Sequence, residues 1–296
     1  MSNKLSLQST VKFHTGREMP RLGFGSGGLK GDVGIDAVSY AMKTGYLMVD
    51  TAQMYGNEEG RKEGSRKRKA QSGVDRQNLF ICTKWQPPVE GSDARPTPEQ
   101  VRDEARQSVA RLDKSRFEKE YLDLMIIHHP RPDPEGRANH WKGLALAQKE
   151  GWVKDIGVSN FNIKHLEALP APLPAVNQIE LHPWCQQREV VEYCKSKGIV
   201  LQAFCPLVRI RKDKFEDPVV VKISKKHNKG VAHVLLRWSL QKGFVPIPKA
   251  SSPARIDANK DLYDFELDEQ DMKELDGLDQ GAAGRVSGID PAHLPD

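Results

Sequence analysis

Short runs of apolar residues alternate with longer amphipathic stretches along most of the chain after Asp32. Continuous apolar runs that are each followed by a stretch of helical periodicity indicate a parallel sheet covered by helices on both faces. The expected strands lie at 22–24, 46–49, 79–82, 122–127, 153–158, 175–179, 199–204 and 244–247. The expected helices lie at 33–44, 57–70, 97–112, 137–149, 162–168, 185–197, 231–241 and 253–260.

Eight strand–helix units predict an α/β fold, the closed (β/α)8 TIM barrel. The length of 296 residues suits one such barrel, and no linker or repeat interrupts it, so we expect a single domain over residues 1–296. Val11–Phe13 and Glu18–Met19 flank a turn and predict an N-terminal β-hairpin that covers one barrel end. The tail at 281–296 is rich in Gly, Ala and Pro and is expected to form a loop over a barrel end.

The composition argues against a membrane or metal protein. The first ten residues are polar, and no run approaches the roughly 18 apolar residues that span a bilayer. We therefore expect a cytoplasmic protein. Cys82, Cys185, Cys194 and Cys205 lack the spacing of a metal site and are too few for a disulfide scaffold in a chain of this length.

The formal charge is +5, with a basic run at 61–69. Such a run occurs in nucleic-acid patches and nuclear localisation signals, but here it falls inside the expected helix 57–70 and has no aromatic residues for base stacking. The pattern favours a solvated helix face, so we expect no nucleic-acid partner.

Gly23–Gly28 spells GxGxxG, and Asp50 follows it at about the twenty-residue spacing of the dinucleotide-binding fingerprint. The context of a strand, a tight turn and a helix is missing, because the preceding strand would start directly behind Pro20 and Leu29–Asp32 separates the last glycine from the next helix. A Rossmann-type dehydrogenase therefore stays the less favoured alternative to the barrel.

Polar side chains follow several expected strands. In barrels of this kind, catalytic groups lie at the carboxyl ends of the strands. Each residue has a structural explanation of its own: Asp50 as a helix cap, Lys84 as a surface lysine, His128 as a core imidazole and Asn160 as an N-cap. Their occurrence at one edge of the same barrel predicts a site instead. The residues are Asp50, Tyr55, Lys84, His128, Ser159, Asn160 and Gln178.

The chain contains a series of motifs that resemble those of the aldo-keto reductase family. They occur in the family's order and cover nearly the whole length of the chain. The resemblance implies a (β/α)8 barrel, in agreement with the periodicity, and the cofactor NADPH/NADP+. The motifs are Gly45–Glu58, Thr83–Lys84, Leu122–His128, Gly157–Phe161, Asn177–Pro183 and Ile247–Lys249.

The resemblance implies that Asp50, Tyr55, Lys84 and His128 form the catalytic tetrad. Hydride delivered to a carbonyl carbon builds negative charge on the oxygen, which calls for a proton donor and positive charge nearby. Tyr55 would donate the proton, and Lys84, held by Asp50, would lower the pKa of the phenol. His128 would orient the carbonyl oxygen. A zinc site at His128 and His129 is disfavoured, because neighbours on a strand point to opposite faces.

The resemblance also implies cofactor contacts. Phe204 stands where the family usually has a tyrosine, and Cys205 replaces a serine, which puts one pyrophosphate contact in doubt. Lys249 and Arg255 would hold a 2′-phosphate and favour NADPH over NADH. Ala250 and Ala258 replace residues that are frequent in the adenosine pocket. The full set is Ser26, Asp50, Ser159, Asn160, Gln178, Phe204, Cys205, Pro206, Leu207, Lys249, Ser251, Ser252, Arg255 and Asn259.

In the expected substrate pocket the match to the family is weaker. Gly27 and His129 replace large aromatic residues, and Trp85 is expected to supply part of the wall. The loop 209–216 is short and charged, so we expect an open, polar pocket.

Together these observations predict a monomeric, NADPH-dependent reductase of aldehydes or activated ketones, with a small-molecule carbonyl substrate. The alternative in another functional class is an NADP-sensing regulatory subunit built on the same barrel. An intact tetrad argues against that alternative, because a sensor does not need all four groups.

Overall fold

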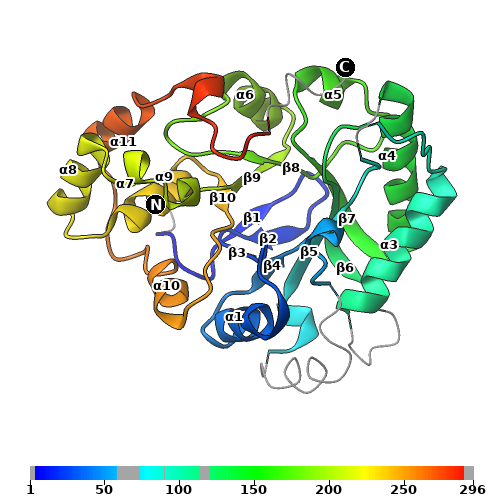
Figure 1. Cartoon of the computed structure of the whole chain (residues 1–296), viewed down its shortest axis with the longest axis horizontal. Helices are drawn as coiled ribbons and strands as arrows, with labels where there is room; N and C mark the ends of the chain where they lie inside the picture. Colours follow the sequence, from blue (N-terminus) through cyan, green and yellow to red (C-terminus); the bar gives the residue numbers. More distant parts are fainter. Residues whose placement is uncertain (1–3, 59–73, 90, 114–119, 132, 290–296) are drawn as a thin grey trace.

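The computed structural model describes residues 4–58, 74–89, 91–113, 120–131 and 133–289. Eight parallel strands lie side by side in chain order and helices surround them, which confirms the predicted architecture (Figure 1). The strands are β3 (Phe24–Gly25), β4 (Met48–Asp50), β5 (Phe80–Trp85), β6 (Leu122–Ile127), β7 (Val153–Ser159), β8 (Val176–Glu180), β9 (Val200–Phe204) and β10 (Val245–Pro246).

Backbone hydrogen bonds between the first and last strands close the sheet. The N–H of Gly23 donates to the carbonyl oxygen of Pro246 at 3.1 Å, and that of Gly25 donates to the carbonyl oxygen of Pro248 at 3.0 Å. A Cβ atom on Gly25 would lie 2.8 Å from the carbonyl oxygen of Ile247. Glycine is thus required for this approach, and the GxGxxG segment serves barrel closure rather than a doubly wound fold.

Most predicted helices are present, with local differences at their ends. The fourth begins at Pro134 rather than near 137, because the side chain of Asp133 caps it and proline is preorganised for the first turn. The predicted helix at 57–70 and the basic run at 61–69 lie, from residue 59 onward, outside the described residues. Helices at 212–215, 218–226 and 269–276 were not predicted.

The described helices are α1 (Gly31–Lys43), α3 (Pro98–Leu112), α4 (Pro134–Lys149), α5 (Ile163–Glu167), α6 (Arg188–Ser196), α7 (Lys212–Phe215), α8 (Pro218–Lys226), α9 (Val231–Gln241), α10 (Pro253–Ala258) and α11 (Glu269–Asp276). Short 3-10 turns add η1 (Gln53–Tyr55), η2 (Arg76–Asn78), η3 (Val208–Ile210) and η4 (Gly281–Gly284).

The predicted hairpin is present and closes the amino end of the barrel. Strands β1 (Thr10–Lys12) and β2 (Glu18–Pro20) pair antiparallel and lie over the centre of the barrel in Figure 1. Phe13 and Met19 are buried against the side chains that fill the barrel interior. The hairpin is therefore part of the core rather than an appended turn.

The end of the described chain crosses the opposite, carboxyl end of the barrel, as predicted for a C-terminal loop. The backbone N–H of Val286 donates to Glu180 Oε1 at 2.6 Å, and the hydroxyl of Ser287 donates to Glu180 Oε2. Glu180 ends strand β8. A buried carboxylate therefore ties the loop to the rim of the barrel, up to residue 289.

Candidate active site

The alternation of strand residues places polar groups in the top layer of the barrel interior. Met48, Cys82 and Leu124 pack together inside the barrel. Side chains alternate between the two faces of a strand, so the residues two or four positions later also point into the barrel. At these positions the side chains are polar. These positions hold Asp50, Lys84 and His128, and the same parity brings in Gln178, Gln202 and Phe204.

Lys84 and Asp50 form a buried ion pair in this layer. Lys84 Nζ lies 2.5 Å from Asp50 Oδ1 and donates to the carbonyl oxygen of Thr51 at 2.9 Å, and Lys84 is only 1% exposed. Burial is the largest single influence and lowers the pKa of Lys84, but the charge and hydrogen bond of Asp50, together with the nearby Tyr55 and Cys82, outweigh burial and the pKa is raised. The ammonium therefore stays charged inside the barrel.

Tyr55 is held above this pair by the short turn η1. Lys84 Nζ lies 5.2 Å from the centroid of its ring. The side-chain amide of Gln53 fixes the turn, because it donates to Ser108 at 3.0 Å and accepts from the N–H of Gln86 at 2.8 Å. Asn57 ties the loop to strand β3 through the carbonyl oxygen of Ser26 at 3.1 Å.

The protonation of Tyr55 differs from the sequence-based expectation. Burial raises the pKa of the phenol above its ordinary value of 10, and although Lys84 opposes this shift it does not reverse it. The buried surroundings disfavour the phenolate more than one cation, itself paired with Asp50, favours it. Tyr55 is therefore a protonated donor at neutral pH.

His128 packs against Tyr55 edge to face, with ring centroids 5.7 Å apart and an interplanar angle of 82°. Burial lowers the pKa of His128 well below 6.5, and the nearby charge of Lys84 adds to the shift. The imidazole is therefore neutral. The structure thus brings the four predicted tetrad residues together in one cluster.

Asn160, Ser159 and Gln178 lie beside this cluster. Gln178 Nε2 donates to Asp50 Oδ2 and to Gln202 Oε1, both at 2.9 Å, and Ser159 Oγ donates to the carbonyl oxygen of Gln178 at 2.8 Å. Asn160 has a left-handed backbone with φ 62° and is buried, yet its Oδ1 has no hydrogen-bond partner among the described residues. A buried acceptor without a partner fits a ligand N–H.

Strand β9 is followed by a backbone-strained segment. Phe204 and Cys205 are half-buried at its end, Pro206 is buried and Leu207 packs on the core. Cys205, Val208, Arg209 and Ile210 all have positive φ, between 44° and 56°. Burial raises the pKa of the Cys205 thiol, although Arg209 opposes the shift. Such strain in non-glycine residues is found mostly at functional sites.

The predicted adenosine-end residues form a second, more exposed group around α10. Arg255 Nη2 donates to Ser251 Oγ at 3.0 Å and Arg255 Nε to Ser252 Oγ at 3.2 Å. Lys249 and Arg255 are exposed, whereas Asn259 is buried. The two cations are therefore accessible to an anion.

Of the predicted pocket residues, the structure brings two to the site and turns one away. A Cβ on Gly27 would lie 3.4 Å from Tyr55 Cζ, and the ring of His129 stacks on His128 with centroids 4.6 Å apart. Trp85 instead faces the helices: its Nε1 donates to Glu104 on α3 at 2.8 Å, and its ring packs on His140 of α4. It lies on the outer face of β5 because Lys84 occupies the inner one.

Sequence reasoning missed three supporting residues. Gln53, Asn57 and Gln202 hold Tyr55 and Gln178 in place through the contacts given above. The position of Gln202 could have been predicted from the sequence, because it lies two residues before Phe204 on the same strand and so points into the barrel as well. Gln53 and Asn57 stand in the motif Gly45–Glu58, but the sequence does not indicate their contacts with Ser108, Gln86 and Ser26, which lie on other segments.

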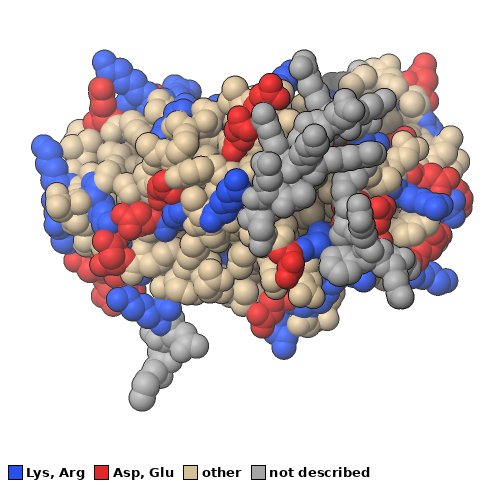
Figure 2. Space-filling view, turned by 90° about the horizontal axis from the view of Figure 1, so that it is seen from below, with Lys and Arg blue, Asp and Glu red and all other residues tan. Residues whose placement is uncertain are grey.

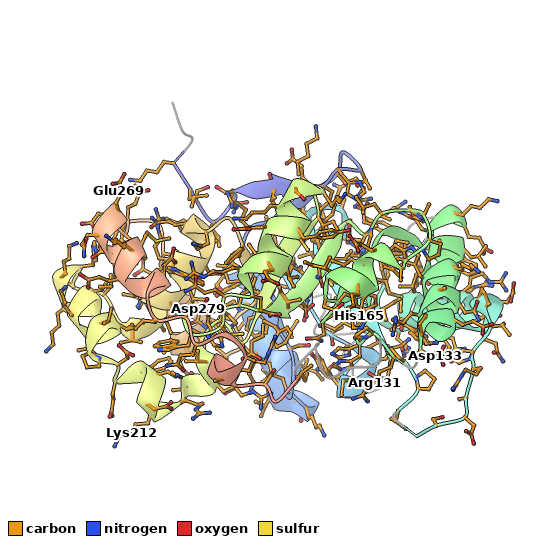
Figure 3. The ribbon with its side chains drawn as sticks, turned by 90° about the horizontal axis from the view of Figure 1, so that it is seen from above. Arg131, Asp133, His165, Lys212, Glu269 and Asp279 are labelled. Atoms are coloured by element: carbon orange, nitrogen blue, oxygen red, sulfur yellow. The ribbon has the colours of Figure 1, made fainter. Side chains whose placement is uncertain are left out.

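The carboxyl end of the barrel, which carries the candidate site, is opposite the hairpin. Figure 3 places Arg131, which follows β6, and Lys212, which follows β9, at the end away from β1. All four cysteines are free thiols. Within the part of the chain that the structure describes, no cluster of three or more metal-binding side chains occurs, and no helix is long and apolar enough to cross a membrane.

Comparison with known proteins gives strong matches over most of the chain. The model of the Aldo/keto reductase family matches residues 21–280. A glyoxal reductase of Bacillus subtilis (strain 168) is 40% identical, over 93% of this chain and 94% of the relative. A methylglyoxal reductase of Escherichia coli (strain K12) is 36% identical, over 92% and 94%. The crystal structure of a Bombyx mori aldo-keto reductase in complex with NADP has a TM-score of 0.83 at 28% identity, covering 98% and 99%.

Proposed function

The chain belongs to the aldo/keto reductase family and is an oxidoreductase, and we propose that it reduces aldehydes or activated ketones to alcohols with NADPH. The observation that carries this proposal is the cluster of a buried, charged Lys84, a protonated Tyr55 and a neutral His128 at the carboxyl end of the barrel. NADPH, when bound, supplies the hydride that the carbonyl carbon accepts.

The chain's own residues handle the carbonyl oxygen. As negative charge builds there, the Tyr55 hydroxyl gives it a proton and the phenolate that remains is stabilised by the ammonium of Lys84. Asp50 holds Lys84 at 2.5 Å and keeps it charged. The neutral ring of His128 orients the carbonyl oxygen by donating an N–H to it.

Three observations support an NADPH site. The orphaned Oδ1 of Asn160 is an acceptor for an amide N–H such as that of a carboxamide group, with Ser159 and Gln178 beside it. The segment between β9 and the strained turn η3 consists of the predicted cofactor residues Cys205, Pro206 and Leu207, and Phe204 precedes it at the end of β9. Lys249 and Arg255 supply accessible cations for a 2′-phosphate. The Bombyx mori structure contains NADP, which supports the same cofactor here.

Small, reactive aldehydes are the proposed substrate class. Two relatives are named as glyoxal and methylglyoxal reductases. Gly27 leaves space beside Tyr55, and His129 gives that wall of the pocket a polar ring. A pocket of this kind suits a short, polar carbonyl compound better than a large apolar one.

Replacement of Tyr55 by Phe tests the proposal. The variant lacks the proton donor, so kcat for NADPH-dependent reduction of glyoxal should fall by roughly 10²–10⁴-fold, while NADPH binding, followed by fluorescence, is retained. Near wild-type turnover in the variant would contradict the proposal. A wild-type protein that binds NADPH but consumes little with a broad carbonyl panel would favour the sensor alternative.

We also propose a monomeric protein in the cytoplasm, with residues 1–296 forming one domain. Acidic and basic side chains are interspersed on the described part of the surface seen in Figure 2. On this face, the mixture supports the proposal that no nucleic acid binds there, because nucleic acid is bound by surfaces of one charge sign.

A further inference from the structure

Among the residues that the structure describes, none makes a hydrogen bond that fixes the ring of His128 through its Nδ1. That nitrogen is buried. In many functional histidines, a carbonyl or carboxylate holds the second ring nitrogen and so sets the orientation of the ring. The plane of His128 must therefore be held by packing, and Tyr55 contacts it only edge to face.

His129 supplies the missing contact. The two imidazole rings are parallel within 1°, with centroids 4.6 Å apart, so one flat face of His128 is covered. Consecutive residues in a strand point to opposite faces, but β6 ends at Ile127 and the chain beyond it brings both rings to the same side. His128 is thus enclosed between the face of His129 and Tyr55.

Asn160 in turn holds His129. Its Nδ2 donates to the carbonyl oxygen of His128 and to Ser159 Oγ, both at 3.1 Å, and lies 3.4 Å from His129 Nδ1. The contact with a carbonyl oxygen requires the amide nitrogen, a donor, at this position. The amide nitrogen offers two hydrogens to three neighbours and cannot itself accept, so His129 Nδ1 shares a hydrogen as the acceptor and the ring is the neutral tautomer with its hydrogen on Nε2. Burial, which lowers the pKa of His129 to about 4, agrees with a neutral ring.

We propose that His129 is a positioning residue: clamped by Asn160, it fixes the ring plane of His128 and thereby the orientation of the carbonyl oxygen during reduction. The rate argument rests on the proposed reductase function. Asn160 links this clamp to the NADPH site, because the oxygen of the same amide, Oδ1, is the orphaned acceptor described above. Loss of the clamp should affect the hydride-transfer step more than cofactor affinity.

Two substitutions separate the stacking face from the Asn160 contact. His129→Phe keeps a flat ring but loses the acceptor, whereas His129→Ala loses both. In single-turnover experiments with NADPH and glyoxal, we expect about a 10-fold slower hydride transfer in His129→Ala, because small misplacements at a reacting centre are costly. His129→Phe, which keeps the stacking face but is no longer clamped, should be slowed by about 3-fold. The NADPH dissociation constant should change less than about 2-fold in both.

The control is His233→Ala, which removes a half-buried imidazole from α9, outside the site. It should match the wild-type rate. Equal rates in wild type and His129→Ala, equal losses in the Ala and Phe variants, or an effect on KM alone would overturn the positioning role.

A second measurement does not depend on turnover. Side-chain nitrogen NMR of the wild-type protein should show His129 protonated at Nε2 only, and the His128 signals should broaden in His129→Ala but not in His233→Ala. Protonation of His129 at Nδ1, or an unchanged His128 signal in the Ala variant, would overturn the inference. If the wild type reduces no carbonyl compound, the proposed function fails while this measurement still decides the clamp.

Discussion

At the level of single residues, burial has more influence on protonation at the site than the nearby cation. Tyr55 is close to Lys84, yet its pKa is raised above 10, and the pKa of His128 is lowered well below 6.5. In both cases the cost of a charged form in a buried place is the largest cause. The site therefore contains one fixed cation, one protonated acid and one neutral ring across the neutral range.

The pH dependence of carbonyl reduction follows from these directions. The acid form of Tyr55 is needed, and a raised pKa keeps it populated until the pH rises past 10. Because the pKa of His128 is lowered well below 6.5, its ring stays neutral when the pH falls to 6.5. We expect kcat/KM for reduction to be flat between about pH 7 and about pH 9.5 and to fall only above that range. A break near neutral pH would contradict this protonation pattern.

Cofactor preference is also decided by single residues. Lys249 and Arg255 are exposed cations that we assign to the 2′-phosphate. Replacing both with Ala should weaken NADPH binding by at least roughly 10- to 100-fold, since each hydrogen bond to a charged group contributes about 1.5–3 kcal/mol. NADH binding should change little. Binding titrations with both cofactors check this, and an equal loss for the two would refute the phosphate role.

At the level of elements, strand alternation explains which side chains reach the site. The inward parity of β4, β5 and β6 places Asp50, Lys84 and His128 in one layer, and this parity is readable in the sequence. The same rule puts Trp85 outside, next to Glu104 on α3. The prediction that Trp85 lines the pocket did not take this alternation into account. His129 shows the limit of the rule: His128 keeps the parity one residue past the end of β6, but the ring of His129 lies on the same side and stacks on it.

The N-terminal hairpin is attached to the barrel by charge as well as by packing. Arg17 donates to Asp123 at 3.1 Å and forms an ion pair with Asp155 at 3.1 Å. Asp155 is 1% exposed. Besides the ion pair with Arg17, its carboxylate accepts a hydrogen bond from the hydroxyl of Thr15 at 2.8 Å. The hairpin therefore neutralises carboxylates at the amino ends of β6 and β7.

Replacing Arg17 by Met should lower the free energy of unfolding by about 2 kcal/mol at neutral pH, because it leaves a buried carboxylate without its cation. Arg17→Lys, which keeps the charge, should lose less. Burial already raises the pKa of Asp155 above 3.8, so the deficit of the Met variant should shrink as acidification protonates this group. Denaturant unfolding at two pH values measures both effects; a deficit independent of pH would argue against the charge explanation.

At the level of the whole molecule, barrel closure depends on close contact between β3 and β10. Gly25→Ala would place a Cβ 2.8 Å from a backbone oxygen of Ile247, which cannot move away as a flexible side chain can. We expect a loss of roughly 1–3 kcal/mol, as for overpacking of a close contact. Gly27→Ala is the matched control, since its Cβ meets only the Tyr55 ring at 3.4 Å. Equal melting temperatures for the two variants would contradict the closure argument.

The sequence by itself determined the strand–helix repeat, the hairpin, the family and the polar residues at strand ends, because these depend on local periodicity and short motifs. It did not indicate α8 (Pro218–Lys226) or α11 (Glu269–Asp276), which pack on the core through Val220, Ile223 and Leu275. Only the tertiary structure decided the protonation of Tyr55 and the clamp of His128 by His129 and Asn160. Burial and ring stacking depend on residues distant in the chain, and no local pattern records them.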